Sequence, residues 1–341
     1  MEINNSKIKV QFILKKNQNV NFKGKKAGLF NSANFVVNFL QQQDNFEVDI
    51  TDVVDSNEID KVVTAFNPDI VIIEALWVPP SKFLELFSHK RHSNRKWVVR
   101  IHSKAPFLAN EGIATKWVKE YCDISSVIIS PNTEELTNQF KVCFPHGNFL
   151  YLPNIYTASN IELPEKIVDE KIINIGCFGA IRPLKNHYSQ AIAAIEFAES
   201  INKKLHFHIN SSRTEQNGDN VLKNVEAIFS VGRHELIKHP WYDHDDFVIM
   251  SSKLDLGMQV SFTESFNIVT ADLISAKVPM IVSDDIDWMP LLQRVSPTAH
   301  NDIVNKLKLA YNLPSLFITP QENALKYYNA KSEKIWLTAL K

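Results

Sequence analysis

The sequence predicts an α/β fold made of two domains, each built around its own parallel sheet. Strand and helix patterns alternate along the chain, and the alternation runs through twice, which is typical of parallel-sheet domains. The strand candidates are nearly continuous apolar runs, as expected for strands that helices cover on both faces. A chain of 341 residues also suits two domains of about 150 residues better than one core.

The first half begins with a strand, continues with a helix and then carries four further strand candidates. The helix pattern is GLFNSANFVVNFLQQQ (28–43), in which apolar residues recur at helical spacing. LYLPNIY (150–156) ends this half, and the polar segment 157–170 follows as a linker. The predicted strands are KIKVQFIL (7–14), FEVDITDVV (46–54), DIVIIEAL (69–76), KWVVRIHS (96–103) and SVIIS (126–130).

The second half repeats the pattern in a domain expected to span residues 171–320. A long helix over 321–341 then has no strand after it, and we expect it to cross back onto the first domain, residues 1–156. The predicted strands are segments 171–181, 204–210, 255–261 and 278–284, and the predicted helices are 187–201, 219–230, 243–253 and 264–277.

Composition indicates a globular protein of the cytoplasm. Hydrophobic residues make up 45% of the chain and charged residues 22%, and no apolar run reaches the roughly 20 residues of a membrane helix. The first residues lack the layout of a signal peptide. The three cysteines show no disulfide or metal spacing, which is typical of buried cysteines in a reducing compartment.

Positive charge gathers at the beginning of the chain, although the net charge is only -1. Residues 1–43 hold seven lysines against a single acid, Glu2. A solvated surface loop would give the same count, and an anionic acceptor or phosphate is the alternative. The lysines are Lys7, Lys9, Lys15, Lys16, Lys23, Lys25 and Lys26.

The segment 260–285 carries the most informative pair of acids. Glu264 follows a predicted strand, where α/β sheets bind ligands beyond the strand ends. Asp272 lies eight residues further, two turns along a helix expected to begin near Phe266. The first N–H groups of that helix, around Asn267 and Ile268, can bind a diphosphate. The two carboxylates would then bracket a nucleotide-sugar, with Glu264 on the sugar and Asp272 on the ribose.

This segment resembles the Glu-x7-Glu signature of retaining GT-B glycosyltransferases, E-G-F-G-x-x-x-x-E-A-x-x-x-G-x-P. The chain has E-S-F-N-I-V-T-A-D-L-I-S-A-K-V-P from residue 264 onward. Ser265, Asn267 and Lys277 replace glycines of the pattern, and Asp272 replaces its second Glu. The resemblance implies two Rossmann-like domains that face each other across a cleft, with the donor on the second and the acceptor on the first.

The segment FGAIRPLKNH (178–187) supplies two cations after a strand that ends at Gly179. Arg182 and Lys185 can neutralise the diphosphate that leaves as the glycosidic bond breaks. The resemblance assigns this role to both residues and makes Gly179 part of the donor site. A solvated basic loop is the alternative.

Two weaker candidates lie in the first half. His102 ends a predicted strand together with Arg100 and resembles the family histidine that faces the donor sugar, although a lone histidine is often structural. Gly24 and Gly28 precede the first helix and would let backbone N–H groups approach a phosphate or sugar, or would simply form a turn.

The stretches 72–83, 100–114 and 258–272 also resemble glycosyltransferases of large tailed phages. That likeness makes a modified base of DNA the favoured acceptor over a saccharide or small molecule, and it implies a host cytoplasm as the location. No metal is expected, because DDID (284–287) follows a late strand and HPWYDHDD (239–246) is typical of a loop and helix cap. No other cofactor is expected.

The resulting hypothesis is a retaining hexosyl- or pentosyltransferase in which the leaving diphosphate helps to deprotonate the acceptor. His102, Arg182, Lys185 and Glu264 are the expected catalytic residues. Two alternatives remain open, a nucleotide-sugar-binding protein without activity and an epimerase of the same fold.

Overall fold

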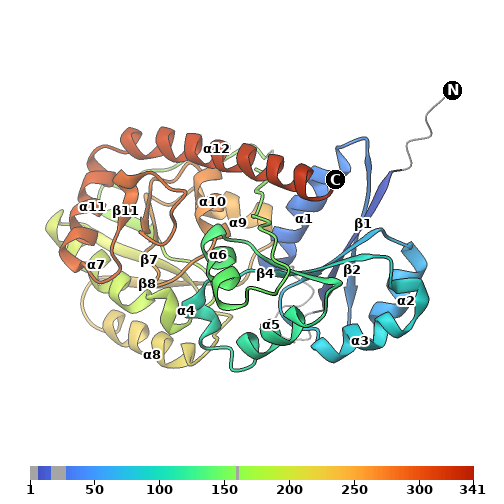
Figure 1. Ribbon diagram of the computed structural model, residues 1–341. Coiled ribbons are helices and arrows are strands. Elements are labelled where there is room, and N and C mark those ends of the chain that lie inside the picture. Colours follow the sequence, from blue (N-terminus) through green and yellow to red (C-terminus); the bar gives the residue numbers. More distant parts are fainter. Residues whose placement is uncertain (1–6, 17–27, 159–160) are drawn as a thin grey trace. The chain divides into compact units, whose positions relative to one another are not determined.

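The computed structural model describes residues 7–16, 28–158 and 161–341. The chain divides into two compact units (Figure 1). Described residues up to 156 together with 329–341 form the N-terminal unit, and residues between 157 and 328 form the C-terminal unit. Each unit holds one parallel sheet with interleaved helices, so the predicted α/β class is confirmed.

The sheet of the N-terminal unit has five parallel strands in the order β2-β1-β3-β4-β5. All five strands were predicted from apolar runs; β2, β3 and β4 are shorter than those runs, and β1 and β5 are shifted from them by one residue. The strands are β1 (Ile8–Lys15), β2 (Phe46–Val53), β3 (Ile70–Glu74), β4 (Lys96–Ile101) and β5 (Val127–Pro131). The helices are α1 (Gly28–Gln41), α2 (Ile59–Phe66), α3 (Pro80–Ser88), α4 (Ala105–Leu108), α5 (Ala114–Cys122) and α6 (Glu134–Cys143).

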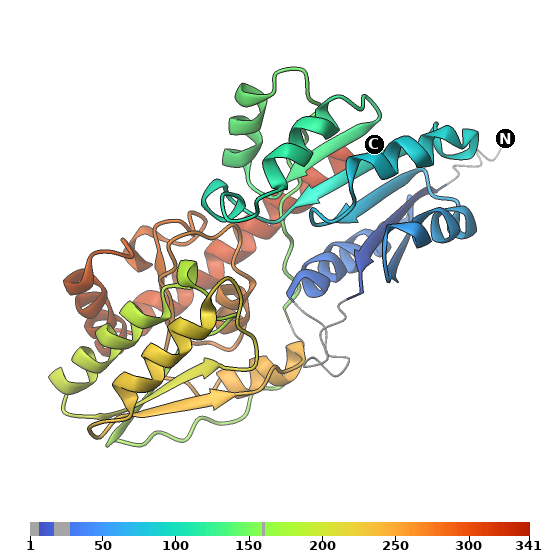
Figure 2. The same cartoon turned by 90° about the horizontal axis from the view of Figure 1, so that it is seen from below.

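Alternate residues of the central strands fill two separate cores, one on each face of this sheet. Ile73 and Val99 belong to the core covered by α2, α3, α5 and α6. Ile72 and Val98, their chain neighbours, belong to the core covered by α1. Successive side chains of a strand point to opposite faces, so burial on both faces explains why the strands are apolar throughout. Figures 1 and 2 show helices on either side of the strands.

The sheet of the C-terminal unit has six parallel strands in the order β11-β10-β9-β6-β7-β8. The strands are β6 (Ile172–Gly176), β7 (Lys204–Asn210), β8 (Glu235–His239), β9 (Leu256–Gln259), β10 (Met280–Ser283) and β11 (Arg294–Val295). The helices are α7 (His187–Ser200), α8 (Gly218–Phe229), α9 (His244–Ser251), α10 (Ile268–Ser275), α11 (His300–Asn312) and α12 (Ser315–Ala339), of which α12 belongs to the N-terminal unit from residue 329 onward.

The sequence reading missed both edge strands of this sheet, β8 and β11. No residue of β8 is buried, and β11 has only two residues, so neither carries the apolar run that marks a central strand. The last helix also begins earlier than the predicted start at residue 321. Pro320 interrupts the helical pattern in the sequence, yet α12 continues through it from Ser315.

Candidate functional site

The C-terminal sheet changes its winding direction between β6 and β9. These two strands are neighbours, and the chain proceeds outward from them in opposite directions, through β7 and β8 on one side and through β10 and β11 on the other. Ligands of open α/β sheets bind at such a switch point, beyond the carboxyl ends of the strands. The loop after β6 carries Gly179, Arg182 and Lys185, and the loop after β9 carries Glu264.

Lys185 and Glu264 meet at this switch point. The Lys185 ammonium donates a hydrogen bond to Glu264 Oε1, and the two side chains are only 10% and 8% exposed. Gly179 lies against the same lysine, since a Cβ at Gly179 would stand 3.7 Å from Lys185 Nζ. Its φ of +115° is one that side chains rarely adopt, so glycine is required there. The sheet order therefore joins two sequence motifs that lie 79 residues apart.

Arg182 does not share the partner of Lys185. Its guanidinium donates to Glu215 Oε2 at 3.0 Å, and Arg213 also pairs with Glu215. The two cations that the sequence placed together thus bind different carboxylates. Their common field is still visible at His187, whose pKa is lowered to about 3 by burial and by the charges of Lys185 and Arg182. Both cations of the loop after β6 therefore act on the same buried ring.

The helix that carries Asp272 begins later than the sequence suggested. α10 starts at Ile268, so Glu264 lies in the preceding loop and Asp272 in the second turn. The expected spacing of two helical turns between the acids is therefore wrong. The loop is held instead by Asp285, whose Oδ2 accepts a hydrogen bond from the Glu264 backbone N–H.

Asn267 shapes the turn into α10. It adopts a left-handed conformation with φ 58°, and its side chain accepts from the Thr270 N–H at 3.0 Å as the helix cap. Its amide also donates to Gln259 Oε1 at 2.9 Å. Asn tolerates positive φ better than most residues and is a good cap, which explains how it replaces a glycine.

The side chain of Phe266 is buried and has a structural role. The ring is 2% exposed and forms a three-ring cluster with Trp288 and Tyr328, whose centroids lie 5.3 and 5.0 Å from its own and 5.6 Å from each other. The indole of Trp288 donates to the Phe266 carbonyl at 2.9 Å. A donor could therefore contact this residue only through its backbone, whereas Ile268 offers its N–H as the first residue of α10.

Asp272 has a partner that the sequence reading did not identify, His244. His244 Nε2 lies 3.0 Å from Asp272 Oδ1, which joins the start of α9 to α10. Burial alone would lower the pKa of His244, but Asp272 and Asp245 outweigh it and raise that pKa. The segment around His244 was interpreted only as a loop and cap, and Asp243 is indeed the N-cap residue, without a side-chain bond.

A second polar cluster lies at the carboxyl ends of β3 and β4 in the N-terminal unit. His102 Nε2 is hydrogen-bonded to Glu74 Oε2, and Arg100 Nη1 donates to Glu74 Oε1 at 3.0 Å. Glu74 and Arg100 are fully buried, while the His102 side chain keeps 15% exposure. Burial would raise the pKa of Glu74, but Arg100 and His102 reverse this and lower it. Sequence reasoning did not single out Glu74 as a site residue: it ends an apolar strand, and the stretch around it was used only for a resemblance.

The charge state of His102 follows from the same contacts. Burial and the nearby Arg100 lower the pKa of His102 more than Glu74 raises it. The ring is therefore neutral at neutral pH, with its Nε2–H donated to the ionised Glu74. Of the glycines singled out here, Gly28 is the first residue of α1, and Gly24 lies outside the described residues.

No protein-family model and no curated protein matches the sequence. Solved structures do match over nearly the whole chain. Sucrose-phosphate synthase from Thermosynechococcus elongatus aligns with a TM-score of 0.71 and 11% identity, covering 98% of this chain and 97% of that one. The fold is that of the GT-B glycosyltransferases.

Two further GT-B structures are similar. Trehalose-6-phosphate from E. coli, bound with UDP-2-fluoro glucose, aligns with a TM-score of 0.67 and 11% identity over 97% of this chain and 98% of that one. A mutant of TarM from S. aureus, in complex with fondaparinux, α-GlcNAc-glycerol and UDP, aligns with a TM-score of 0.60 and 18% identity over 80% and 55%.

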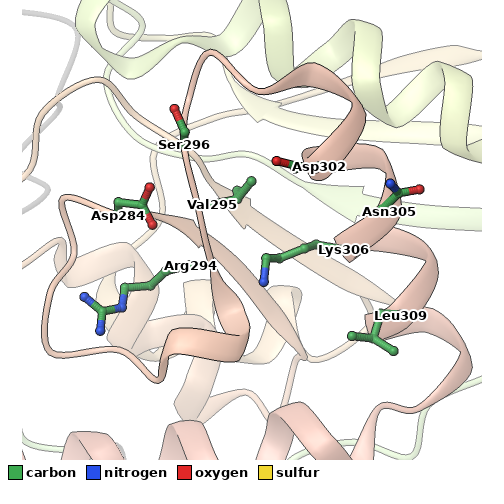
Figure 3. Close-up of a pocket in the computed structure, with 8 residues that line it drawn as sticks. All are labelled: Asp284, Arg294, Val295, Ser296, Asp302, Asn305, Lys306 and Leu309. Atoms are coloured by element: carbon green, nitrogen blue, oxygen red, sulfur yellow. The ribbon is translucent and has the colours of Figure 1, made fainter.

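A cavity of about 490 Å³ is lined by residues of the C-terminal unit other than those of the candidate site (Figure 3). It is open between β10, β11 and α11, and none of the predicted site residues lines it. Its charged residues are Asp284, Asp302, Arg294 and Lys306, which cancel, so its charge selects neither anions nor cations. The cavity therefore has no electrostatic preference for a nucleotide diphosphate.

Among the residues that the structure describes, no group of three or more His, Cys, Asp or Glu side chains could hold a metal ion. Asp285 of the DDID segment caps the Glu264 loop, and Asp284 lines the cavity. Over the same residues no helix is long and apolar enough to cross a membrane. Independence from metal stays a prediction.

Proposed function

We propose that the chain is a retaining glycosyltransferase whose C-terminal unit binds a nucleotide-sugar donor. The pairing of Lys185 with Glu264 at the switch point between β6 and β9 carries this proposal. It places a cation and a carboxylate where an α/β sheet binds its ligand, beside the N-terminus of α10. Asp272 adds a second carboxylate in the second turn of that helix.

Each group has a role that its chemistry supports. Glu264 accepts hydrogen bonds from hydroxyls of the donor sugar, and Asp272 accepts them from the ribose. Lys185, with Arg182 in the same positive loop, stabilises the diphosphate as negative charge develops on it. The backbone N–H groups at the start of α10 bind the same diphosphate.

The proposed transfer needs no nucleophile from the protein. The bond between the anomeric carbon and the diphosphate oxygen breaks, and its electron pair leaves with the nucleoside diphosphate. The acceptor oxygen forms the new bond on the same face, and its proton passes to the leaving diphosphate. His102, neutral and held by Glu74, is proposed to donate or accept a hydrogen bond at the sugar or the acceptor.

The backbone supports the resemblance to the Glu-x7-Glu signature. Asn267 and Lys277, two of the residues that replace its glycines, both have positive φ, 58° and 61°. Glycine is the residue that adopts this conformation without strain. A positive φ at these two positions would explain why the pattern has glycines there, and in this chain Asn267 and Lys277 adopt it instead.

The names of similar structures support a UDP-sugar as the first donor to test. One of them is bound with UDP-2-fluoro glucose, and another comes from work on glycosyl transfer with retention by trehalose-6-phosphate synthase. A thermal-shift screen of nucleotide-sugars is the direct experiment. A ligand at 100 times its dissociation constant adds about 2.7 kcal/mol of stability, a measurable shift.

The site assignment is tested with Glu264→Ala and Asp272→Ala. Each should weaken donor affinity or turnover about tenfold or more, roughly 1.4 kcal/mol, because a hydrogen bond to a charged group is lost. Glu196→Ala is the matched control, since it removes an exposed carboxylate from α7 that pairs with a histidine at the surface, His300. Wild-type affinity and turnover in both site variants would rule the assignment out.

The acceptor has two candidates. The phage resemblance and the lysine-rich beginning favour a hydroxylated base in DNA. Of those lysines, Lys9 pairs with Glu47 at 3.0 Å, and Lys23, Lys25 and Lys26 lie outside the described residues. The names of similar structures, sucrose-phosphate synthase among them, favour a saccharide or small molecule.

Offering hydroxymethylated duplex DNA and a panel of saccharides with each donor decides between these acceptors. A mass increase on the base, with binding that weakens as salt rises, supports DNA. Transfer to a saccharide alone rules DNA out. Release of nucleoside diphosphate without any acceptor separates a transferase from a binding protein, and conversion of the donor sugar would reveal an epimerase. Activity unchanged by EDTA supports a metal-independent reaction.

A further inference from the structure

His244 and Asp272 form a buried pair between two helices of the C-terminal unit. His244 is the first residue of α9, Asp272 lies on α10, and their side chains are 17% and 8% exposed. Nε2 of the ring lies 3.0 Å from Asp272 Oδ1, and Nδ1 lies 3.3 Å from Asp245 Oδ1. Both ring nitrogens thus face carboxylate oxygens. Only the protonated imidazolium can donate from both, because the neutral ring keeps one nitrogen as an acceptor.

We propose that His244 is a positioning residue for the ribose contact: its protonated ring holds Asp272 in place and makes donor affinity depend on pH. This inference rests on the proposed function, since it takes Asp272 to be the carboxylate that binds the donor ribose.

The direction of the pH dependence follows from the charges that face the ring. Among the described residues, two carboxylates raise the pKa of the ring: Asp272, on the packed helix α10, and Asp245, on its own helix. Deprotonation of the ring removes one positive charge from beside these carboxylates, so the cluster becomes more negative by one unit. The donor diphosphate is an anion, so it binds less well to the more negative group. Affinity should therefore be highest below the raised pKa of His244 and fall as pH rises through it.

Linkage sets the size of the effect. Donor binding favours the charged ring, so it raises the pKa of His244 further and takes up a proton. A rise of about one unit on binding corresponds to an affinity that falls about tenfold across the transition. The other histidine near this loop, His187, stays neutral in this range because its pKa is lowered to about 3.

Calorimetric titration of the full chain with UDP-glucose, or with the nucleotide-sugar that the thermal-shift screen selects, tests the inference over roughly pH 6 to pH 9. The two diphosphate ionisations of such a compound are complete in this range. Wild-type affinity should fall about tenfold as pH rises. His244→Gln cannot become charged, so its affinity should be flat and low throughout. A His244→Gln profile that follows the wild type overturns the inference.

His300→Gln is the matched control. His300 Nε2 lies 2.7 Å from Glu196 Oε2, so it is also a histidine–carboxylate pair, but it is exposed and joins α11 to α7. This variant should keep the wild-type profile. Loss of the profile in His300→Gln as well would show a general charge effect and overturn the role of His244.

An NMR titration of the His244 ring in the ligand-free protein separates this inference from the proposed function. Asp272→Asn should lower the pKa of His244, because the favourable carboxylate is removed. An unchanged pKa overturns the pair, whatever the ligand. A normal NMR titration with no nucleotide-sugar bound at any pH overturns the donor site instead, and the ribose role with it.

Discussion

The polar clusters of the two units lie at the same kind of place, the carboxyl ends of parallel strands, yet they are built differently. In the N-terminal unit Arg100 and Glu74 are both completely buried. The guanidinium donates to four groups, of which only one is a charged side chain. In the C-terminal unit Lys185 meets Glu264 through one hydrogen bond, and both side chains keep some contact with solvent.

The buried guanidinium of Arg100 stabilises the fold, whereas the partly exposed Lys185 and Glu264 are accessible to a ligand. Arg100 donates to the carbonyls of Leu152 and Pro153 and to Asn154 Oδ1, so it ties the segment after β5 and α6 to the sheet. Of this cluster, His102 retains exposure. The Lys185 ammonium and the Glu264 carboxylate, by contrast, join two loops at a switch point, where α/β sheets bind their ligands.

The strongest test of this comparison is Arg100→Met. It should lower the free energy of unfolding by about 3–5 kcal/mol, because Glu74 is left buried without its cation. Chemical denaturation measures the change. Arg91→Met is the control, since Arg91 pairs with Asp60 at 2.8 Å on the surface and should lose less than about 1 kcal/mol. Equal effects in the two variants would contradict the structural role of Arg100.

A second test uses acid and the C-terminal unit. His187 is buried, and its pKa is lowered to about 3. Between about pH 6.5 and about pH 3 the unfolded chain therefore carries a proton on this ring that the folded chain does not. The free energy of unfolding accordingly decreases by about 1.4 kcal/mol for each unit by which the pH is lowered. His187→Gln should remove this part of the slope in denaturation curves recorded across the range. His146→Gln, which changes an exposed histidine, should leave it. A slope that persists in His187→Gln would show that the ring does not stay neutral.

The smallest expected effect concerns the backbone after α10. Lys277 has φ 61°, and the N–H groups of Lys277 and Val278 close the helix end onto Ile274 and Leu273. Lys277→Gly should stabilise the protein by about 1 kcal/mol, because glycine adopts this conformation without strain. Thermal unfolding measures it. Lys253→Gly, at an exposed turn without positive φ, should not stabilise. A loss of stability in Lys277→Gly would mean that its ion pair with Glu322 outweighs the strain.

Much of the fold could be predicted from the sequence, because strands buried on both faces are composed almost entirely of apolar residues. Ile70–Glu74 and Met280–Ser283 are covered on both faces, and their apolar runs were recognisable at once. Edge strand β8 lies half in solvent and carries no such run. Helix starts were less secure, because the cap at Asn267 depends on a left-handed turn that no apolar pattern marks.

The sequence by itself determined the α/β class and the residue types of the candidate site, because strand periodicity, the spacing of Glu264 and Asp272, and the position of Lys185 after a strand are local properties. Only the tertiary structure decided their partners. Lys185 meets Glu264 because β6 and β9 are adjacent, and His244 meets Asp272 because α9 packs on α10. Such pairs depend on the order of strands and on helix packing, which join residues from 28 to 79 positions apart. No pattern within one segment contains that information.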